Sequence, residues 1–340
     1  MLIMITIRDV ARRLNLSITT VSRALDGYDD VAEETRRQVI EVAKEMGYTP
    51  NRAARELRRQ RTDTLGYILP ADKPQFADPF IAEFIAGLGD EAAANNYDLL
   101  VSTAPAESAQ EKALYQRWVQ GGKVDGLVLN YTRLRDWRVQ YLTQQKKPFV
   151  SLERSLDDVE FVGVEVDPGE GYAELIDYLV GMGHSRIAFV GAWRELKIQY
   201  DRFAAFERCL SSAAVLIDPA LVLEGDLTLE GGYRAAQLLF SLSRPPTAVV
   251  CVNDLTAIGA LHAAHEMGLR IGQDIAVAGF DGIMGAAHTN PPLTTLDQPV
   301  YTIARKLVSL LLGLISGAEI PERQVCLQPK LLIRESTGGR

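Results

Sequence analysis

The chain of 340 residues contains only three cysteines, Cys209, Cys251 and Cys326, and they form no CxxC pair. This odd number and wide spacing argue against a disulfide framework and against a zinc site, so we expect reduced thiols. No apolar run approaches the roughly 20 residues of a membrane-spanning helix, and residues 1–9 lack the basic lead of a secretory signal. We therefore expect a cytoplasmic protein with no membrane partner.

The sequence also lacks the patterns that carry nucleotide or catalytic chemistry. Residues 169–174, GEGYAE, have Glu174 in the place of the third glycine of a dinucleotide fingerprint, and no P-loop occurs. No Ser-His-Asp or Cys-His arrangement is evident. His262 and His265 lack an obvious third metal ligand, so a solvated helix face is expected there. These observations predict no enzyme activity, no cofactor and no metal.

Charge is divided unevenly along the chain. There are 36 Lys and Arg against 44 Asp and Glu, a net charge of −8. Residues 1–61 nevertheless carry 12 basic and 9 acidic residues, and residues 51–61, NRAARELRRQR, carry five Arg against one Glu. A basic segment of this density neutralises phosphates, whereas an acidic remainder repels them. The distribution predicts a small nucleic-acid-binding module on an acidic body.

The first fifty residues have the pattern of three short helices. Thr6 and Ser17 are plausible N-caps for helices over 6–13 and 18–25, and a third helix is expected over 33–46. In the second helix, the inward residues are expected to be Val21, Ala24 and Leu25, and the outward residues Ile18, Thr19, Ser22 and Arg23. Three such helices with a tight turn after the first make an all-α helix-turn-helix domain.

From residue 64 onward, short apolar runs alternate with stretches of helical periodicity. The runs cover residues 64–70, 97–104, 126–131, 148–153, 186–192, 248–254 and 275–281. Runs rich in Val, Ile and Leu at this spacing are typical of buried parallel strands in βαβ units. Residues 169–179 and 230–240 start helices in the same way, which favours two lobes over one sheet. We expect a doubly wound α/β body that binds a ligand at the carboxyl ends of its strands.

Several stretches spread over the chain are similar to one family. They include TIRDVARRLNLSITTVSRALDG at 6–27, ETRRQVIEVAKEMGYTPNRAARELR at 34–58, VNDLTAIGAL at 252–261 and DIAVAGFDG at 274–282. The chain thereby resembles the lactose-repressor (LacI/GalR) family of bacterial transcription regulators along nearly its whole length. The resemblance implies a helix-turn-helix head at 1–50, a hinge at 51–62 and an effector-binding, dimerising body at 63–340. The body would comprise an N-lobe (63–161 and 298–325) and a C-lobe (162–297 and 326–340) with a periplasmic-binding-protein-like fold.

The resemblance assigns DNA contacts to the head. Ile18 and Thr19 occupy the positions that vary most with operator sequence in the family, and the other matching positions are Thr6, Ser17, Thr20, Ser22, Arg23 and Thr35. Hydroxyl groups at the start of a recognition helix contact phosphates, and an arginine grips guanine at two atoms. The alternative is a surface helix whose hydroxyl groups only cap and solvate. Asn15 replaces the usual turn glycine and tolerates the left-handed conformation.

In the hinge, Asn51, Arg52, Ala54 and Leu57 match the family's minor-groove motif. Isolated helices shorter than ~12 residues are marginal in water, so this segment is expected to fold only on DNA. The resemblance then implies that Leu57 of each subunit wedges into the minor groove and bends the duplex. A solvated basic linker is the alternative.

For a small-molecule effector, the resemblance implicates Glu153, Arg202, Asn253 and Asp281. Carboxylate, amide and guanidinium groups that converge on a dry cleft suit adjacent hydroxyl groups, which favours a sugar or sugar derivative. A structural ion pair between Arg202 and Asp281 is the alternative.

The chain also offers aromatic residues for an apolar platform under a sugar ring. Candidates are Phe80, Trp193 and Phe76, with core packing as an equal alternative. Where relatives place aromatics, this chain has Gly163, Leu227 and Val300, which is consistent with a pocket wide enough for a disaccharide.

Together these features predict a homodimeric repressor of carbohydrate-utilisation genes that binds a pseudo-palindromic double-stranded DNA operator. A dimer is expected because a single head with 12 basic and 9 acidic residues makes too few phosphate contacts. One rival is a sugar-binding transport component without a DNA role, which the basic head and the missing export signal oppose. The other is an enzyme of sugar metabolism, which lacks a catalytic constellation. The missing terminal heptad helix argues against a tetramer.

Overall fold

The computed structural model describes residues 5–48, 61–70, 78–157 and 159–339. The chain divides into two compact units, residues 1–62 and 63–340, which we call the head and the body. Phe76 and the hinge residues Asn51, Arg52, Ala54 and Leu57 lie outside the described residues. No helix in the described ranges combines the length and apolarity that crossing a bilayer requires.

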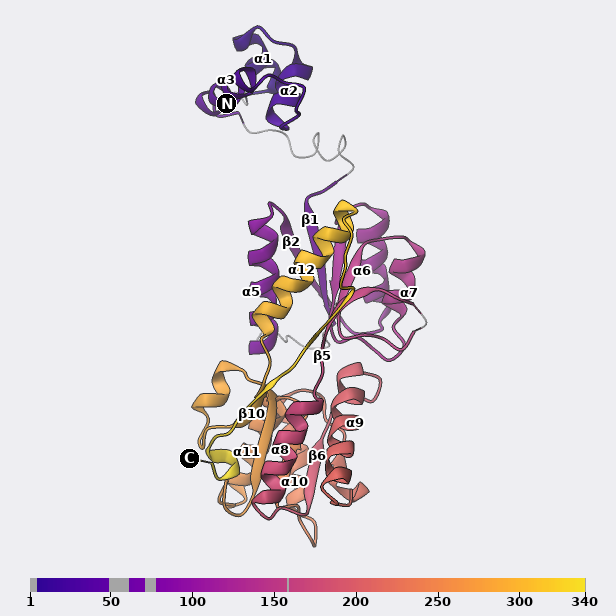
Figure 1. Ribbon diagram of the computed structural model, residues 1–340, viewed down its shortest axis with the longest axis vertical. Coiled ribbons are helices and arrows are strands. Elements are labelled where there is room, and N and C mark those ends of the chain that lie inside the picture. Colours follow the sequence, from indigo (N-terminus) through magenta and orange to yellow (C-terminus); the bar gives the residue numbers. More distant parts are fainter. Residues whose placement is uncertain (1–4, 49–60, 71–77, 158, 340) are drawn as a thin grey trace. The chain divides into compact units, whose positions relative to one another are not determined.

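Three helices form the head: α1 (Ile7–Leu14), α2 (Ile18–Leu25) and α3 (Glu33–Glu45). Figure 1 shows them as one small cluster. Each contributes a fully buried valine, Val10, Val21 or Val39, to a common core. This packing stabilises helices that are individually too short to persist in water. The predicted helix-turn-helix arrangement is confirmed.

The ends of the head helices follow from capping side chains. The Thr6 backbone amide donates to Asp9 Oδ2 at 3.0 Å before α1, and Ser17 Oγ accepts from the Thr20 amide at 3.0 Å at the start of α2. Between the two helices, Asn15 has a φ of 52°, in the left-handed region that ends a helix sharply. The tight turn that the sequence predicts is therefore made by an asparagine.

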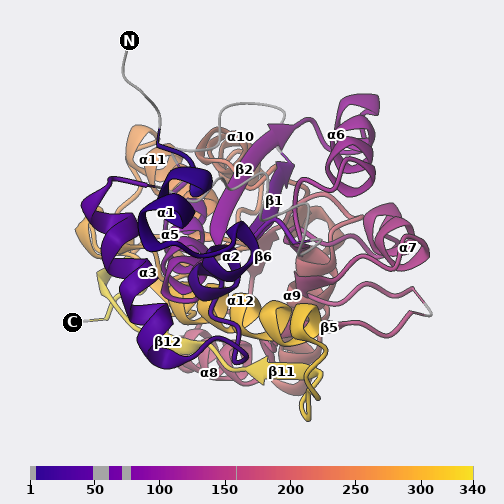
Figure 2. The same ribbon diagram turned by 90° about the horizontal axis from the view of Figure 1, so that it is seen from above.

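The N-lobe of the body contains a parallel six-stranded sheet in the order β11-β5-β4-β3-β1-β2. Its strands are β1 (Thr64–Pro70), β2 (Asp98–Ala104), β3 (Gly126–Leu129), β4 (Phe149–Leu152), β5 (Val162–Val166) and β11 (Gln324–Leu327). Figures 1 and 2 show α5 (Pro79–Ala94) and α12 (Val300–Ser316) on one side, and α6 (Ala109–Gln120) and α7 (Trp137–Gln144) on the other. Along β1, Tyr67 and Leu69 pack in one core cluster and Ile68 in the other, as the alternation of a strand requires.

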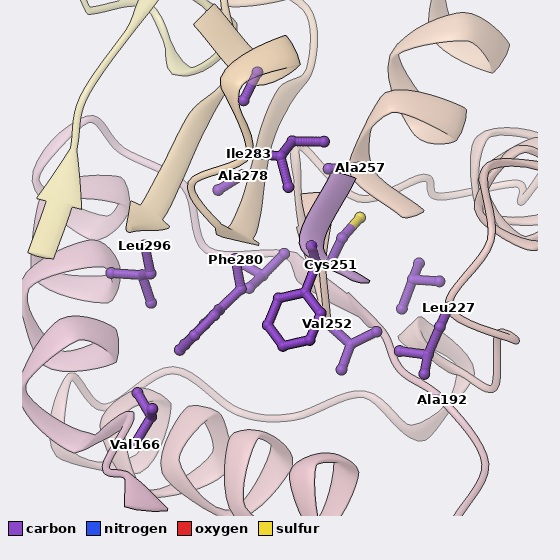
Figure 3. Packing of buried hydrophobic residues seen from close by; sticks show 14 of the residues in the cluster. Val166, Ala192, Leu227, Cys251, Val252, Ala257, Ala278, Phe280, Ile283 and Leu296 are labelled. Atoms are coloured by element: carbon purple, nitrogen blue, oxygen red, sulfur yellow. The ribbon is translucent and has the colours of Figure 1, made fainter. Parts of the chain in front are cut away.

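The C-lobe has a second six-stranded sheet, in the order β12-β10-β9-β8-β6-β7, with only β12 antiparallel. Its strands are β6 (Ile187–Val190), β7 (Val222–Leu223), β8 (Ala248–Cys251), β9 (Ala276–Asp281), β10 (Thr294–Asp297) and β12 (Lys330–Leu332). Helix α8 (Gly169–Gly181) packs against α9 (Lys197–Ser212), and α10 (Leu229–Phe240) against α11 (Asp254–Glu266). Figure 3 shows Val252, Phe280 and Leu227 in the buried apolar layer of this lobe. The predicted two-lobed α/β body is confirmed.

The predicted boundaries between the lobes need correction at two places. Strand β5 belongs to the N-lobe sheet, because Val162 pairs with Val150 of β4, whereas the sequence placed the C-lobe from residue 162 onward. Likewise, the whole of β11 pairs with β5, although the predicted boundary fell after residue 325. The described residues between β4 and β5 form no helix, so helical spacing gave no signal there.

Candidate functional site

The start of α2 presents a polar, accessible surface on the head. Ile18 is 45% exposed, and Ser17 and Thr19 are also exposed. Ser17 Oγ and Thr20 Oγ1 lie 2.8 Å apart and share a hydrogen bond, which fixes both hydroxyl groups at the helix end. An exposed helix start with fixed hydroxyl groups has the form of an element that enters the DNA major groove. Thr6 is exposed before α1, and Thr35 is half-buried in the first turn of α3.

Two other predicted contact residues of α2 are less accessible. Ser22 is 7% exposed, so the prediction that it faces outward is wrong; its Oγ lies 3.5 Å from Asp26 Oδ2, one turn further along the chain. The Arg23 guanidinium is held by Asp30, with Nε 3.1 Å from Oδ1, and lies over the Tyr28 ring at 4.9 Å. Arg23 would therefore have to release Asp30 before its guanidinium could contact a base.

A cleft in the body lies between the two lobes. Its empty volume is about 420 Å³. Residues of both sheets and their connecting helices line it: Phe80, Asn130, Tyr131, Leu152, Glu153, Ile198, Arg202, Leu227, Asn253, Asp281 and Gln298. The structure thus brings together five of the six predicted effector residues; Trp193 does not line the cleft and is 39% exposed.

The polar lining residues stand where parallel strands end. Asn130 follows β3, Glu153 follows β4, and Asp281 is the last residue of β9. Glu153 and Asp281 have φ values of 70° and 117°, which side-chain-bearing residues rarely adopt. Strained backbone of this kind persists where the surrounding structure enforces it, and it clusters at ligand sites.

Arg202 organises the C-lobe side of the cleft. Its Nη1 donates to the Val252 carbonyl and lies 3.3 Å from Asp281 Oδ1, and its guanidinium carbon is 3.6 Å from the centre of the Phe280 ring. Gln298 Nε2 donates to the same Asp281 oxygen at 2.7 Å. The ion pair that the sequence left as an alternative does form, and it also fixes both charged groups at the cleft wall.

Burial dominates the electrostatics of the carboxyl groups. It raises the pKa of Glu153 to about 8, although Arg202 acts in the opposite direction. It also raises the pKa of Asp281 to about 8 and that of Asp254 to about 7. Among the described residues, no hydrogen-bond donor reaches the Glu153 carboxyl group. This group therefore favours a ligand that brings a donor of its own.

Asn130 is a lining residue that the sequence reading missed. It is 1% exposed, and neither atom of its side-chain amide has a hydrogen-bond partner. The Tyr67 hydroxyl lies beside the amide, but the two groups do not meet hydrogen-bond geometry. A signal was present, because Asn130 lies near the carboxyl end of the predicted strand run at 126–131, and Asp281 ends the run at 275–281.

A buried ion pair holds the backbone of Asn130 in place. Arg138 Nη2 lies 2.6 Å from Asp136 Oδ2, with both side chains almost fully buried. The same nitrogen donates to the carbonyl oxygens of Asn130 and Tyr131, each at 3.2 Å. A charged group that is buried in this way fixes the loop after β3 and hence the amide at the cleft wall.

The same loop also joins the two lobes. The Leu134 amide donates to the Glu195 carbonyl at 2.8 Å, and the Lys197 amide donates to the Thr132 carbonyl at 2.9 Å. These bonds pair a strip of the N-lobe with the start of α9. A ligand that contacts Asn130 and Arg202 therefore touches both sides of this connection.

The other residues named from the sequence lie partly in the cleft and partly away from it. Of the positions where relatives place aromatics, Leu227 lines the cleft, whereas Gly163 and Val300 do not. Phe80 lines it and stacks on Phe84 with ring centres 6.0 Å apart. His262 Nε2 lies 3.7 Å from Glu266, and no metal-binding group of three His, Cys, Asp or Glu occurs in the described part of the chain.

A helix-turn-helix head joined to a two-lobed body with an internal cleft defines the class of ligand-responsive DNA-binding proteins. Two family models match the chain: bacterial regulatory proteins of the lacI family at residues 6–51, and a periplasmic binding protein-like domain at residues 176–337. The chain is 32% identical over 332 residues to the HTH-type transcriptional repressor CytR of Escherichia coli strain K12, with 98% of this chain and 96% of the relative covered. It therefore belongs to the LacI family of bacterial regulatory proteins.

Further relatives cover the same length. The transcriptional regulator AglR of Rhizobium meliloti strain 1021 is 32% identical, with 98% of this chain and 94% of the relative covered. Among solved structures, the Lac repressor dimer bound to operator and the anti-inducer ONPF is similar, with a TM-score of 0.84, 26% identity, and 98% and 99% of the two chains covered. The complex of the regulator CelR with cellobiose has a TM-score of 0.76, 29% identity and the same coverage.

Proposed function

We propose that this protein is a homodimeric repressor of carbohydrate-utilisation genes whose affinity for its operator is set by a sugar or sugar derivative in the body cleft. The observation that carries the proposal is the combination, in one chain, of an exposed recognition helix and a buried polar cleft between two lobes. The similarity to the Lac repressor dimer on its operator and to CelR with cellobiose supports it.

In this proposal, the head reads DNA through α2. Ile18 and Thr19 contact base edges, because they are exposed at the helix start, and Ser17, Thr20, Thr6 and Thr35 position the helix on the phosphates. Arg23 takes part after it releases Asp30, and Ser22 supports the helix from within. A dimer places two such helices on a pseudo-palindromic site.

The hinge couples the two sites. Asn51, Arg52, Ala54 and Leu57 would fold in the minor groove when two hinges meet, with Leu57 as the wedge. A ligand that changes the lobe arrangement changes whether the hinges meet. A shift in operator occupancy from 99:1 to 1:99 requires that the ligand prefer one state by ~10⁴-fold, about 5.5 kcal/mol.

The ligand would contact Glu153, Arg202, Asn253, Asp281 and Phe80. Hydroxyl groups both donate and accept, which suits carboxyl, amide and guanidinium groups within one small space. We assign Trp193 no contact, because its side chain lies outside the cleft. The protein performs no catalysis in this proposal, and it acts in the cytoplasm, where bacterial DNA lies.

Selection of duplexes from a random pool by the full chain tests the DNA-binding role. We expect a two-fold related sequence to be enriched, and Thr19→Ala to change the preferred base at one position of each half-site. Arg234→Ala, a change at an exposed ion pair on the body, is the control and should keep the wild-type preference. The proposal would be contradicted if no sequence is enriched from the pool at either low or higher salt.

A thermal-shift screen of the full chain against mono- and disaccharides, including cellobiose, tests the effector class. A sugar that stabilises the wild-type chain and fails to stabilise Asp281→Asn supports binding in the cleft. Equal stabilisation of both chains would place the sugar elsewhere and contradict the assignment.

A further inference from the structure

Carboxyl groups outnumber cations around the cleft. Glu153 and Asp281 line it and are 5% and 7% exposed. Asp254 is fully buried near Asp281, and Asp78 caps α5 at the N-lobe side and acts on Asp281 from there. Among the described lining residues, Arg202 is the single cation. An incoming ligand therefore meets mainly negative or protonated groups.

The cations near the cleft already have hydrogen-bond partners. Arg202 Nη1 is bound to the Val252 carbonyl and to Asp281, and its guanidinium is stacked on Phe280. Lys197, which also acts on Glu153, has its Nζ 2.6 Å from Asp201 Oδ1. Each of these side chains would have to give up a carboxyl partner to bind an anion.

Two helix N-termini at the cleft are also occupied. In α5, the Phe80 amide donates to Asp78 Oδ1 at 3.0 Å. In α11, the Thr256 amide donates to Asn253 Oδ1 at 3.0 Å. Helix N-termini bind anions through free amides, and in these two helices the chain's own caps take that place.

One of the unpaired groups in the cleft is neutral. The Asn130 amide is buried without a partner and offers one acceptor and two hydrogen donors. A hydroxyl group satisfies both halves of an amide without adding charge. A cleft with this amide, two buried carboxyl groups and a paired arginine is suited to the hydroxyl groups of an uncharged or cationic molecule.

We propose that the effector carries no negative charge: it is a neutral or positively charged polyhydroxyl compound, and the cleft excludes its phosphate esters and carboxylic acids. This inference rests on the proposed function and narrows its ligand class. Because an added anion would lose its hydration in a poorly solvated cleft whose arginine is already paired, we expect it to bind at least about 30-fold more weakly than its neutral counterpart.

Matched pairs of probes test this proposal by calorimetry on the full chain: cellobiose with cellobionic acid, glucose with glucose 6-phosphate, and adenosine with adenosine 5′-monophosphate. The expected result is that every probe that binds is a neutral member, at least about 30-fold tighter than its anionic partner. Burial raises the pKa of Glu153 to about 8, so at about pH 9 Glu153→Gln removes one negative charge at nearly constant volume, and it should narrow that ratio at least threefold there. Glu207→Gln changes an exposed carboxyl group on α9, outside the cleft lining, and should leave the ratio of the two affinities unchanged.

The outcomes separate the two proposals. An anionic probe that binds as tightly as its neutral partner, or more tightly, and releases the operator would overturn the charge exclusion and leave the regulatory function standing. A neutral probe that binds in the cleft with the expected selectivity but leaves operator affinity unchanged would contradict the regulatory function and leave the charge exclusion standing.

Discussion

Glu153→Gln should stabilise the ligand-free body in alkaline solution and leave its stability in acid nearly unchanged. Burial raises the pKa of Glu153 to about 8 in the folded protein, above the unfolded value of about 4.3. Between these values the folded state holds a proton that the unfolded state has released. The free energy of unfolding of the wild-type chain therefore falls as pH rises through this window, and glutamine removes that loss.

The size of the effect follows from the pKa difference. Each pKa unit corresponds to about 1.4 kcal/mol, so a shift to about 8 sets an upper limit of about 5 kcal/mol. Water that enters the cleft and the nearby Arg202 both reduce the cost of ionisation, so we expect about 2 to 3 kcal/mol between about pH 5 and about pH 8.5. For a body of this size, that is a gain of roughly 4 to 6 °C in Tm at the higher pH.

Differential scanning calorimetry of the full chain at the two pH values measures this gain. Glu207→Gln carries the same chemical change at an exposed position of α9 and should follow the wild-type curve. If Glu153→Gln and the wild-type chain lose the same stability between the two pH values, Glu153 is not buried in a donor-poor environment, and the electrostatic description of the cleft is wrong.

Three further changes test other parts of the molecule. Ser17→Ala removes the cap of α2 and should cost about 1 kcal/mol, seen as faster amide hydrogen exchange in α2, with unchanged exchange in the body; unchanged exchange in α2 would contradict the cap's role. Arg138→Met leaves Asp136 buried without its partner and should lower the free energy of unfolding by about 3 to 5 kcal/mol. The double variant with Asp136→Leu should recover part of this stability. A double variant no more stable than Arg138→Met would refute the ion-pair argument. Leu57→Ala should weaken operator binding and leave effector affinity unchanged, and operator binding at full strength would argue against a wedge.

Elements with one dominant signal were predictable from the sequence. The run at 64–70 coincides with β1, because a strand covered on both faces must be apolar throughout. Ser17 caps α2 as expected, because a hydroxyl group before an apolar period satisfies a free amide locally. Lobe membership was harder, since β5 follows β4 without a helix and its partner β11 comes from the far end of the chain.

The cleft residues at the ends of strands could be predicted from the sequence, whereas the direction of side chains in the surrounding loops could not. Arg202, Asn253 and Asp281 converge because parallel strands present their carboxyl ends, and the helices that follow them, at one edge. Trp193 lies in the loop between β6 and α9, where the packing of the loop, which no periodicity encodes, decides its direction. Ser22 is 7% exposed, so the outward direction that the helical period predicted for it is wrong.

The most direct test of the account is the affinity of the full chain for its selected operator, measured by fluorescence anisotropy with and without a saturating neutral sugar from the screen. We expect the sugar to change the operator affinity of the wild-type protein at least tenfold. The Asp281→Asn variant should bind the operator with wild-type affinity but should not respond to the same concentration of the sugar. Operator affinity that is unchanged by a sugar bound in the cleft, or a response of equal size in Asp281→Asn, would contradict the claim that this cleft controls DNA binding.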